Sequence, residues 1–167
     1  MHALTRTHRT MLYGLSAVIA TFGFSSLGHA MASHHGAVAA AKTSTCTLKT
    51  ADVAPTAIND EDFGTLECSR PFGAGVQHNT ATQSPTSPTT GTLKGESRLF
   101  FKTGTVCATF SMHYTISGSS IAYAGTAKVT GGTGTYKGIS GSAKLTGSSA
   151  DGGTHGTTTE KITVKLP

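Results

Sequence analysis

The sequence predicts an all-β protein of about eight short antiparallel strands, arranged as a barrel or a sandwich. Apolar and polar side chains alternate over residues 105–116, TVCATFSMHYTI, as in a strand with one buried face. Clusters of Gly, Ser, Thr and Pro separate this stretch from others with the same alternation. Glycines also recur inside the strand-like residues 125–147, GTAKVTGGTGTYKGISGSAKLTG, and they favour a closed barrel.

The glycines of residues 125–147 are expected to curve the chain rather than to loosen it. Those at residues 131–134 are expected to supply the positive φ of a tight reversal. Gly125, Gly138 and Gly141 lie in or beside predicted strands, where glycine weakens pairing unless the sheet bends or another backbone comes close. Closing a small barrel requires such bends.

The N-terminus, residues 1–32, has the pattern of a secretory signal peptide. Arg6 and Arg9 precede an uncharged apolar run, and the small residues Ala30 and Ala32 frame a cleavage site. We expect cleavage after Ala32, with a cut after Ala30 as the alternative. The apolar run is short for a membrane-spanning helix. The mature protein of residues 33–167 is therefore expected to leave the membrane and to be secreted or periplasmic.

Residues 33–44, SHHGAVAAAKTS, are expected to form a flexible segment ahead of a single domain over residues 45–167. After cleavage, Ser33, His34 and His35 would form a new terminus whose amine and third-position His suit square-planar Cu(II) or Ni(II). A disordered polar terminus is the favoured interpretation. No other metal site and no cofactor are predicted.

The strands of the domain follow in order along the chain. The weaker ones are expected at about 45–51, 63–69 and 72–79, and the clearer ones lie within 92–101, 105–116, 121–130, 138–147 and 157–166. In the last, Ile162, Val164 and Leu166 are expected to face inward. Residues 80–91, TATQSPTSPTTG, are polar or Pro for the most part and are predicted to be a mobile loop.

The three cysteines are an odd number for an oxidising compartment. Cys46 shares a strand face with Leu48, and Cys68 shares one with Leu66, whereas Cys107 falls on a polar face. A Cys46–Cys68 disulfide is therefore favoured, with Cys107 left as a free or intermolecular thiol. A Cys68–Cys107 bridge remains the alternative, because a bulge would reset the alternation.

The charge pattern argues against nucleic-acid binding. The chain has 13 Lys and Arg against 8 Asp and Glu, and loss of Arg6 and Arg9 with the signal leaves a net charge of +3. Five lysines of the last forty residues alternate with inward apolar positions, which indicates a solvated face. They are Lys128, Lys137, Lys144, Lys161 and Lys165. The absence of Trp argues against stacking on single strands.

Residues 125–141 resemble the segment G-x-A-x-I/V-T-G-G-T-G-x-F/Y-x-G-x-x-G of the allene oxide cyclase and dirigent superfamily. FGTLECSRPFGAGV, residues 63–76, is similar to its early strands, and the likeness covers roughly residues 60–166. In particular, the chain resembles the secreted bacterial members. The resemblance implies an eight-stranded antiparallel closed barrel with a central cavity, often assembled as a homotrimer. It also implies hydrophobic small molecules as ligands, which plant members cyclise or orient during radical coupling.

Acidic residues are the main departure from that family. Its plant members use acidic groups inside the cavity, but here Glu67, Glu96 and Glu160 are assigned to the polar face. Asp60, Glu61, Asp62 and Asp151 are assigned to loops. With no inward carboxyl expected, no catalytic residue is predicted.

Inward apolar and aromatic side chains are the candidate ligand contacts. They are Leu99, Phe110, Met112, Tyr114 and Tyr123. The favoured interpretation is an exported barrel that binds a hydrophobic small molecule or a partner protein without catalysis. The alternative is a cyclase-like or dirigent-like isomerase, and an inward-facing charged residue would distinguish the two. A trimer would need an exposed apolar patch, for which Phe72 and Phe100 are the candidates.

Overall fold

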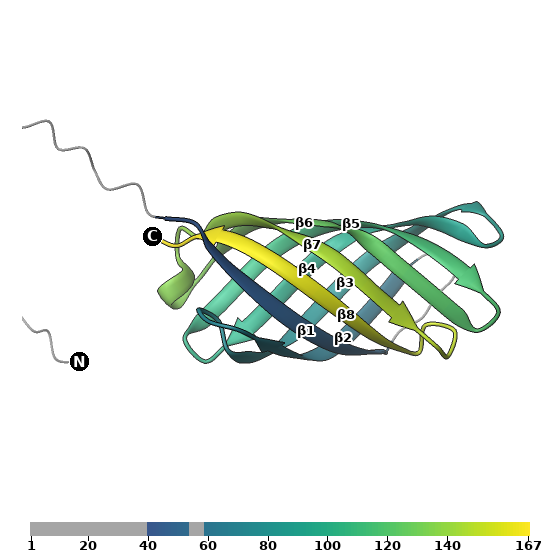
Figure 1. Ribbon diagram of the computed structural model, residues 1–167, viewed down its shortest axis with the longest axis horizontal. Helices are drawn as coiled ribbons and strands as arrows, with labels where there is room; N and C mark the ends of the chain where they lie inside the picture. Colours follow the sequence, from purple (N-terminus) through teal and green to yellow (C-terminus); the bar gives the residue numbers. More distant parts are fainter. Residues whose placement is uncertain (1–39, 54–58) are drawn as a thin grey trace, which may run out of the picture. The chain divides into compact units, whose positions relative to one another are not determined.

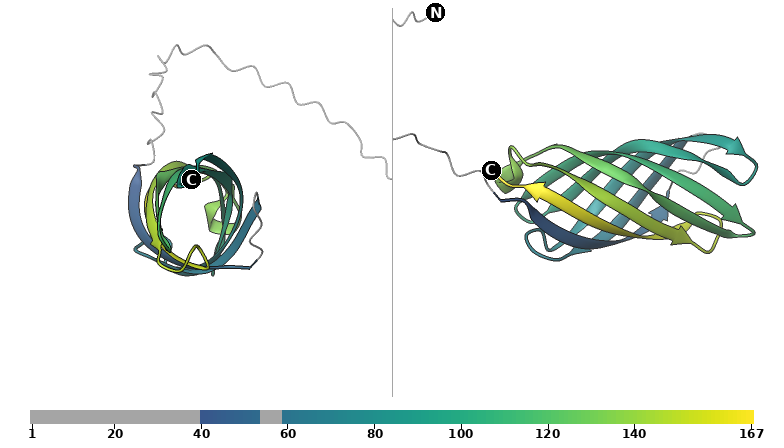
Figure 2. Two further views of the ribbon diagram at one scale, coloured as in Figure 1. Left: turned by 90° about the vertical axis from the view of Figure 1, so that its right-hand side faces the viewer. Right: turned by 45° about the horizontal axis from the view of Figure 1, so that its top comes forward.

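The computed structural model describes residues 40–53 and 59–167, which fold as an antiparallel eight-stranded closed barrel (Figure 1). The strands are β1 (Lys42–Asp52), β2 (Asn59–Cys68), β3 (Ala74–Ser87), β4 (Thr90–Phe101), β5 (Gly104–Ser117), β6 (Ser120–Gly132), β7 (Ser140–Ser149) and β8 (His155–Lys165). Each strand pairs with the next, and β1 pairs with β8 to complete the ring seen end-on in Figure 2. The predicted fold class is confirmed.

The core fills the inside of the barrel because every second side chain of each strand points there. Leu48 and Leu66 face each other across β1 and β2, and Ile162 and Val164 continue the buried face on β8. Leu99 and Phe110 bring β4 and β5 to the same core. Intervening Thr, Ser and Lys side chains are mostly exposed, as the alternation predicts.

Aromatic side chains occupy one end of the barrel, which we call the floor. The short 3-10 turn η1 (Gly134–Tyr136) brings Tyr136 there, against Phe72 and Phe101. The centroids of the Phe72 and Phe101 rings are 5.2 Å apart, and all three side chains are buried. The turn is visible through the ring of strands in Figure 2, close to the chain's C-terminus in Figure 1. Aromatic contacts therefore seal this end.

Two glycines show how the chain bends and turns. Gly134 has φ +59°, in the left-handed region that favours glycine, as expected for the reversal after β6. The same expectation is wrong for Gly131 and Gly132, which have no positive φ and belong to the extended end of β6. Gly125 lies where β6 crosses β5 so closely that a Cβ would collide with the carbonyl oxygen of Ser111. Its lack of a side chain is what lets the two backbones approach, as the glycine pattern predicted.

Residues 80–91 do not form the expected loop. β3 runs on to Ser87 and β4 begins at Thr90, so these residues build a long hairpin with a bulge near Pro85. Thr favours the extended conformation, and the backbone of Thr80 through Ser84 pairs with residues of β4. The polar composition of this segment therefore reflects the exposure of its side chains and not the absence of a strand.

The N-terminal predictions fall mostly outside the described residues. The signal peptide of residues 1–32 and the Ser33, His34 and His35 terminus both lie there. β1 begins at Lys42, so the last three residues of the segment 33–44, expected to be flexible, belong to the barrel. In the described part of the chain, no helix is long and apolar enough to cross a membrane.

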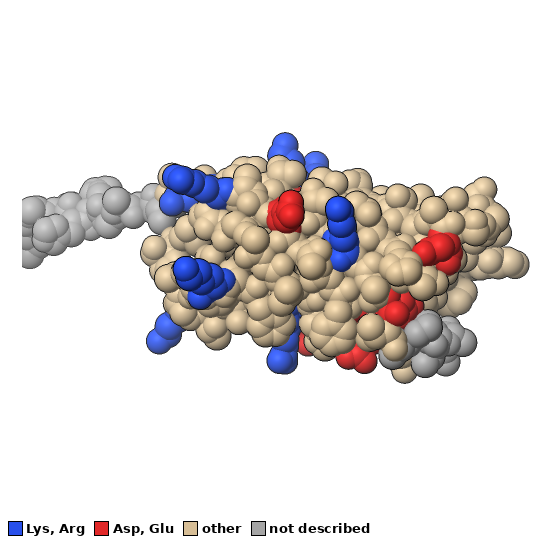
Figure 3. Space-filling view, turned by 90° about the horizontal axis from the view of Figure 1, so that it is seen from below, with Lys and Arg blue, Asp and Glu red and all other residues tan. Residues whose placement is uncertain are grey.

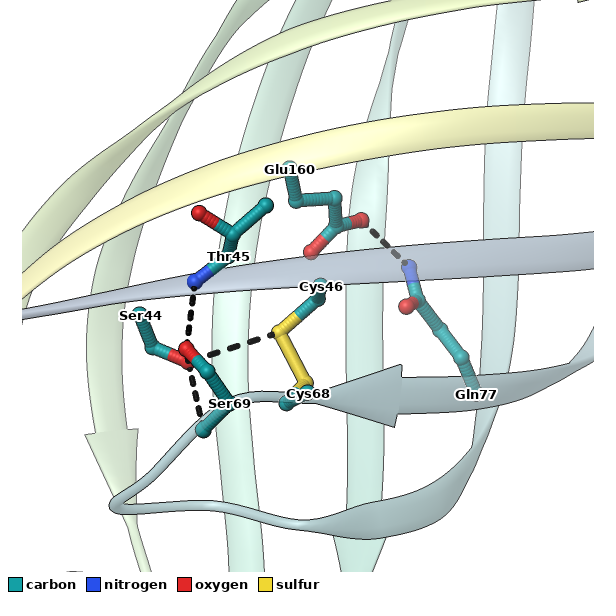
Figure 4. The surroundings of a disulfide bond; sticks show 7 residues. All are labelled: Ser44, Thr45, Cys46, Cys68, Ser69, Gln77 and Glu160. Atoms are coloured by element: carbon teal, nitrogen blue, oxygen red, sulfur yellow. Dashed lines mark hydrogen bonds between the residues drawn. A yellow bond between two sulfur atoms is a disulfide. The ribbon is translucent and has the colours of Figure 1, made fainter.

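The predicted Cys46–Cys68 disulfide is present and joins β1 to β2 at directly opposed positions (Figure 4). Beside it, the buried Ser44 hydroxyl donates to the Ser69 carbonyl oxygen at 2.8 Å, and the Thr45 amide donates to the Ser69 hydroxyl at 3.0 Å. Cys107 is free and half-buried, as expected. The bridge fixes the register of the first strand pair near the floor.

Candidate ligand-binding lumen

The interior of the barrel holds a cavity of about 90 Å³, lined by side chains from all eight strands. We call it the lumen. A buried water needs roughly 10–15 Å³ by the same measure, so the lumen has room for several waters or one small organic molecule. It extends from Phe72 at the floor to Asp52, Asp60 and Gly153 at the opposite end, which we call the mouth.

One side of the lumen is apolar. It is formed by β4 to β7, and its side chains are Leu93, Leu99, Val106, Ala108, Phe110, Met112, Ala127, Val129, Ala143 and Leu145. Such a surface favours a ligand with apolar groups because contact removes both surfaces from water.

Four of the five predicted ligand contacts line the lumen, and three of those four belong to this apolar side. Leu99, Phe110, Met112 and Tyr123 line the lumen. Tyr114 is buried and faces inward, but it is not among the lining residues, because its ring packs directly over Gly91. The structure thus brings four of the five residues together, and their role in binding remains a prediction.

The other side of the lumen is a hydrogen-bonded polar wall from β8, β2, β3 and β4. The Gln77 amide nitrogen Nε2 lies 2.8 Å from Asn79 Oδ1, 2.9 Å from Ser97 Oγ and 3.4 Å from Glu160 Oε1. Asn79 in turn donates from Nδ2 to Asp62 Oδ1 at 2.8 Å. A continuous chain of polar contacts therefore connects Asp62 with the buried Glu160.

Glu160 lies inside the barrel, and its assignment to the polar face is wrong. It has the same strand parity as Ile162 and Val164, so the alternation along β8 already placed it inward. The side chain is buried beside Gln77, as Figure 4 shows. Burial raises the pKa of this carboxyl above its usual range, and the Gln77 hydrogen bond only partly opposes that rise.

Asp60 and Asp62 also face the lumen, and their assignment to a loop is wrong. β2 begins at Asn59, four residues earlier than expected, and both acids share the inward parity of Leu66. Burial raises the pKa of Asp62 to about 7, while the hydrogen bond from Asn79 lowers it and the charge of Asp60 raises it. The pKa of Asp60 is raised by burial first and then by Asp52, with which it shares a hydrogen bond.

Tyr123 stands close to these acids on β6. Burial, followed by the negative charges of Asp60 and Asp62, raises the pKa of its phenol to about 12. The hydroxyl therefore keeps its proton at physiological pH and is available as a hydrogen-bond donor near the mouth.

Sequence reasoning missed Gln77, Asn79 and Ser97 as well as the inward acids. All three are buried polar residues at inward positions of β3 and β4. Their signal was present in the alternation: Asn79 and Gln77 lie two residues apart, and Ser97 lies two before Leu99. A polar residue at an inward position is the feature to look for, because burying it requires partners.

The histidine and acidic side chains of the outer surface and loops lie away from the lumen. His78 pairs with Glu61 at 2.8 Å, and His155 pairs with Asp151 at 2.7 Å, so neither is positioned with a nucleophile. Among the described residues, no group of three or more His, Cys, Asp or Glu side chains is arranged to hold a metal ion.

Fold and lumen together define the class of this protein: a closed eight-stranded antiparallel barrel with an amphipathic interior. No protein-family model matches the sequence, and no curated protein matches it.

Two solved structures are similar to the chain at the level of fold. A pyocyanin demethylase is 17% identical, with 77% of this chain and 100% of that chain covered and a TM-score of 0.44. A pterocarpan synthase dirigent protein is 16% identical, with coverage of 75% and 96% and a TM-score of 0.43. At such low identity, neither protein's activity is assigned to this chain.

Proposed function

We propose that the barrel binds a small, largely apolar organic molecule that also carries hydrogen-bonding groups. The supporting observation is the two-sided lumen: an apolar side from β4 to β7 faces a wall of buried amide, hydroxyl and carboxyl groups. Ligand pockets commonly combine a mostly apolar lining with a few placed polar groups.

Filling the lumen tests this proposal. Ala127 lines the lumen on β6, whereas Ala124, three residues earlier on the same strand, is exposed. Native mass spectrometry of protein purified from its own host should show a bound small molecule in the wild type and in Ala124→Phe, but not in Ala127→Phe. Loss from both variants, or retention by both, would contradict lumenal binding.

A second candidate function, proton-transfer catalysis on the bound molecule, is favoured by one observation. The Asp62 carboxyl has a pKa of about 7 and is hydrogen-bonded through Asn79 to the polar wall that reaches Glu160. General acids and bases work best when their pKa lies near the operating pH. The inward carboxyls thus supply the feature that the cyclase-like or isomerase alternative required.

Solvent exchange separates binding from catalysis. The compound released from the purified protein would be incubated in D₂O with wild type or with Asp62→Asn, and followed by mass spectrometry. Catalysis predicts deuterium uptake or conversion with the wild type alone, although the variant still binds. Equal uptake with and without protein leaves binding as the function.

We also propose that the protein works in an oxidising compartment outside the cytoplasm. The support is the Cys46–Cys68 disulfide, which is typical of exported proteins. Mass analysis of the protein recovered from the medium or periplasm should show a chain that begins at Ser33. Recovery of the full-length, reduced protein from the cytoplasm would contradict this.

A further inference from the structure

Charge is divided sharply between the inside and the outside of the barrel. All eleven Lys and Arg residues of the described chain are exposed, and none of them lines the lumen. Four of the eight acids line it: Asp52, Asp60, Asp62 and Glu160. His is also missing from the lining. A chain with an excess of basic residues therefore encloses an interior whose ionisable lining groups, apart from Tyr123, are all carboxyls.

The carboxyls at the mouth act on one another electrostatically. The charge of Asp60 raises the pKa of Asp62, and Asp52 raises the pKa of both, while His78 from the outer face lowers that of Asp62. Charges of one sign in a partly desolvated site repel one another, and a positive group placed among them would relieve that repulsion. Figure 3, which views the molecule from below, shows most of the visible acidic side chains toward the mouth end and one nearer the middle, among the Lys and Arg side chains.

A second, independent observation comes from the hydrogen bonds of the polar wall. Gln77 is only 3% exposed, yet its carbonyl oxygen Oε1 has no hydrogen-bond partner. Its Nε2 meanwhile faces three acceptor atoms, on Asn79, Ser97 and Glu160. The wall therefore leaves one buried acceptor, Gln77 Oε1, without a donor, and such an imbalance is costly. A ligand that donates hydrogen bonds would correct this imbalance.

Tyr123 adds an aromatic face at the same place. Tyr123 lines the lumen together with Asp52, Asp60 and Asp62, and its hydroxyl lies beside Gly153 at the mouth. An aromatic ring attracts a cation through the negative charge of its face, most strongly where water is excluded.

We infer that the ligand of the lumen is a small organic cation, a protonated amine that carries an apolar group. The inference rests on the proposed function, because it names the chemical class of the bound molecule. The positive nitrogen lies between Asp60, Asp62 and the ring of Tyr123, and its apolar part lies against Met112 and Phe110. Fatty-acid carboxylates and organic phosphates are repelled by the same groups.

Three probes of similar shape test the inference: benzylamine is the cation, benzyl alcohol is a neutral analogue and benzoate is the anion. Their affinities would be measured by NMR titration at pH 8 and low salt, with the methyl signal of Met112 as a reporter inside the lumen. We expect benzylamine to bind about tenfold or more tightly than benzyl alcohol, and benzoate to bind most weakly. Added salt should lower the affinity for benzylamine and leave the affinity for benzyl alcohol unchanged.

The matched variants change net charge equally inside and outside the barrel. Asp60→Asn with Asp62→Asn should abolish the preference for benzylamine and leave the affinity for benzyl alcohol unchanged. Glu67→Gln with Glu96→Gln removes two exposed acids and should preserve the preference. If the inner double variant fails to fold, as judged by circular dichroism, Asp62→Asn alone serves and should lower the preference at least threefold.

The outcomes distinguish failure of the cationic-ligand inference from failure of the proposed binding function. Equal binding of all three probes, or tightest binding of benzoate, overturns the cationic ligand while lumenal binding stands. A preference for benzylamine that survives in the inner variants also overturns it. If none of the three probes binds, the proposed function fails, and the inference fails with it.

Discussion

Glu160 shows how a single residue changes the interpretation of the whole interior. Its β8 neighbours at even positions, Ile162 and Val164, are buried, and so is Glu160. The sequence alternation indicated this arrangement, although a charged residue is ordinarily expected outside. In a barrel that binds ligands, the inward position of a charged side chain is the informative observation, because desolvation makes it costly unless it has a use.

The carboxyl of Asp62 should make stability depend on pH. Its pKa is about 7 in the folded protein and near 3.8 when exposed, so between these values the folded state holds a proton that the unfolded state releases. The contribution of Asp62 to the free energy of unfolding is therefore fully present below about pH 4 and is lost as the pH rises through about 7. We expect the wild type to lose on the order of 2 kcal/mol over this window, an amount reduced for the partial exposure of Asp62.

Urea unfolding between pH 4 and pH 8 would measure this effect, with Asp62→Asn as the test variant. The variant keeps an acceptor for Asn79 but cannot ionise, so its stability should fall less steeply with pH. Asp60 and Glu160, whose pKa values are also raised, should leave it a smaller residual slope of the same sign. A variant slope as steep as that of the wild type would assign the dependence to other groups.

At the scale of strands, the contact between β5 and β6 depends on Gly125. Ala at this position would place a Cβ against the backbone of Ser111 and Met112, so Gly125→Ala should cost about 1–3 kcal/mol. A Cβ added at Gly131 on the same strand would meet nothing within 4 Å, and Gly131→Ala should change stability by about 0.5 kcal/mol or less. Thermal unfolding of both would check this, and similar values for both would mean that β6 shifts to relieve the contact.

The Cys46–Cys68 disulfide closes the loop of chain that connects β1 to β2, and its loss should destabilise this strand pair. Cys46 and Cys68 are 22 residues apart, and loss of a bridge over such a loop should lower the free energy of unfolding by about 3 kcal/mol. Denaturant unfolding of Cys46→Ser with Cys68→Ser would measure the loss. Cys107→Ser, which removes a free thiol, is the control and should remain close to the wild type.

At the scale of the whole molecule, the outer face of β2, β3 and β4 carries an exposed apolar patch of Phe63, Val76 and Phe100. Val76 is paired with Phe100, while the ring of Phe63 stacks on His78 with centroids 4.3 Å apart. Phe72, the other residue expected in such a patch, is instead buried in the floor. We propose this patch as the surface on which the homotrimer expected from the family resemblance would form.

Val76→Asp with Phe100→Asp should therefore convert a trimer to a monomer, as measured by light scattering during gel filtration. Val53→Asp is the control, because Val53 is 55% exposed but lies at the mouth end, away from the patch. A wild-type protein that is monomeric at high concentration would remove the expectation of a trimer.

Local alternation predicted the strands, favoured the observed disulfide and found most of the apolar side of the lumen, while the closed barrel followed from the glycine pattern and the family resemblance. The polar wall could not be assembled in the same way, because Gln77, Asn79 and Ser97 meet only through the pairing of β3 with β4. The inward positions of Asp60 and Asp62 depend on where β2 begins, and Asn59 and Asp60 have low strand propensity, so composition suggested a turn. Which polar side chains meet in the lumen is therefore set by the register between strands, which the local sequence pattern does not determine.

The aromatic floor of Phe72, Phe101 and Tyr136 makes the barrel a dead end rather than a conduit. A ligand that enters the lumen must leave through the same end, so a second ligand can bind only after the first has dissociated. The association and dissociation rates of the ligand are therefore both set at the mouth, and substitutions at Asp60 or Gly153 would change both rates together.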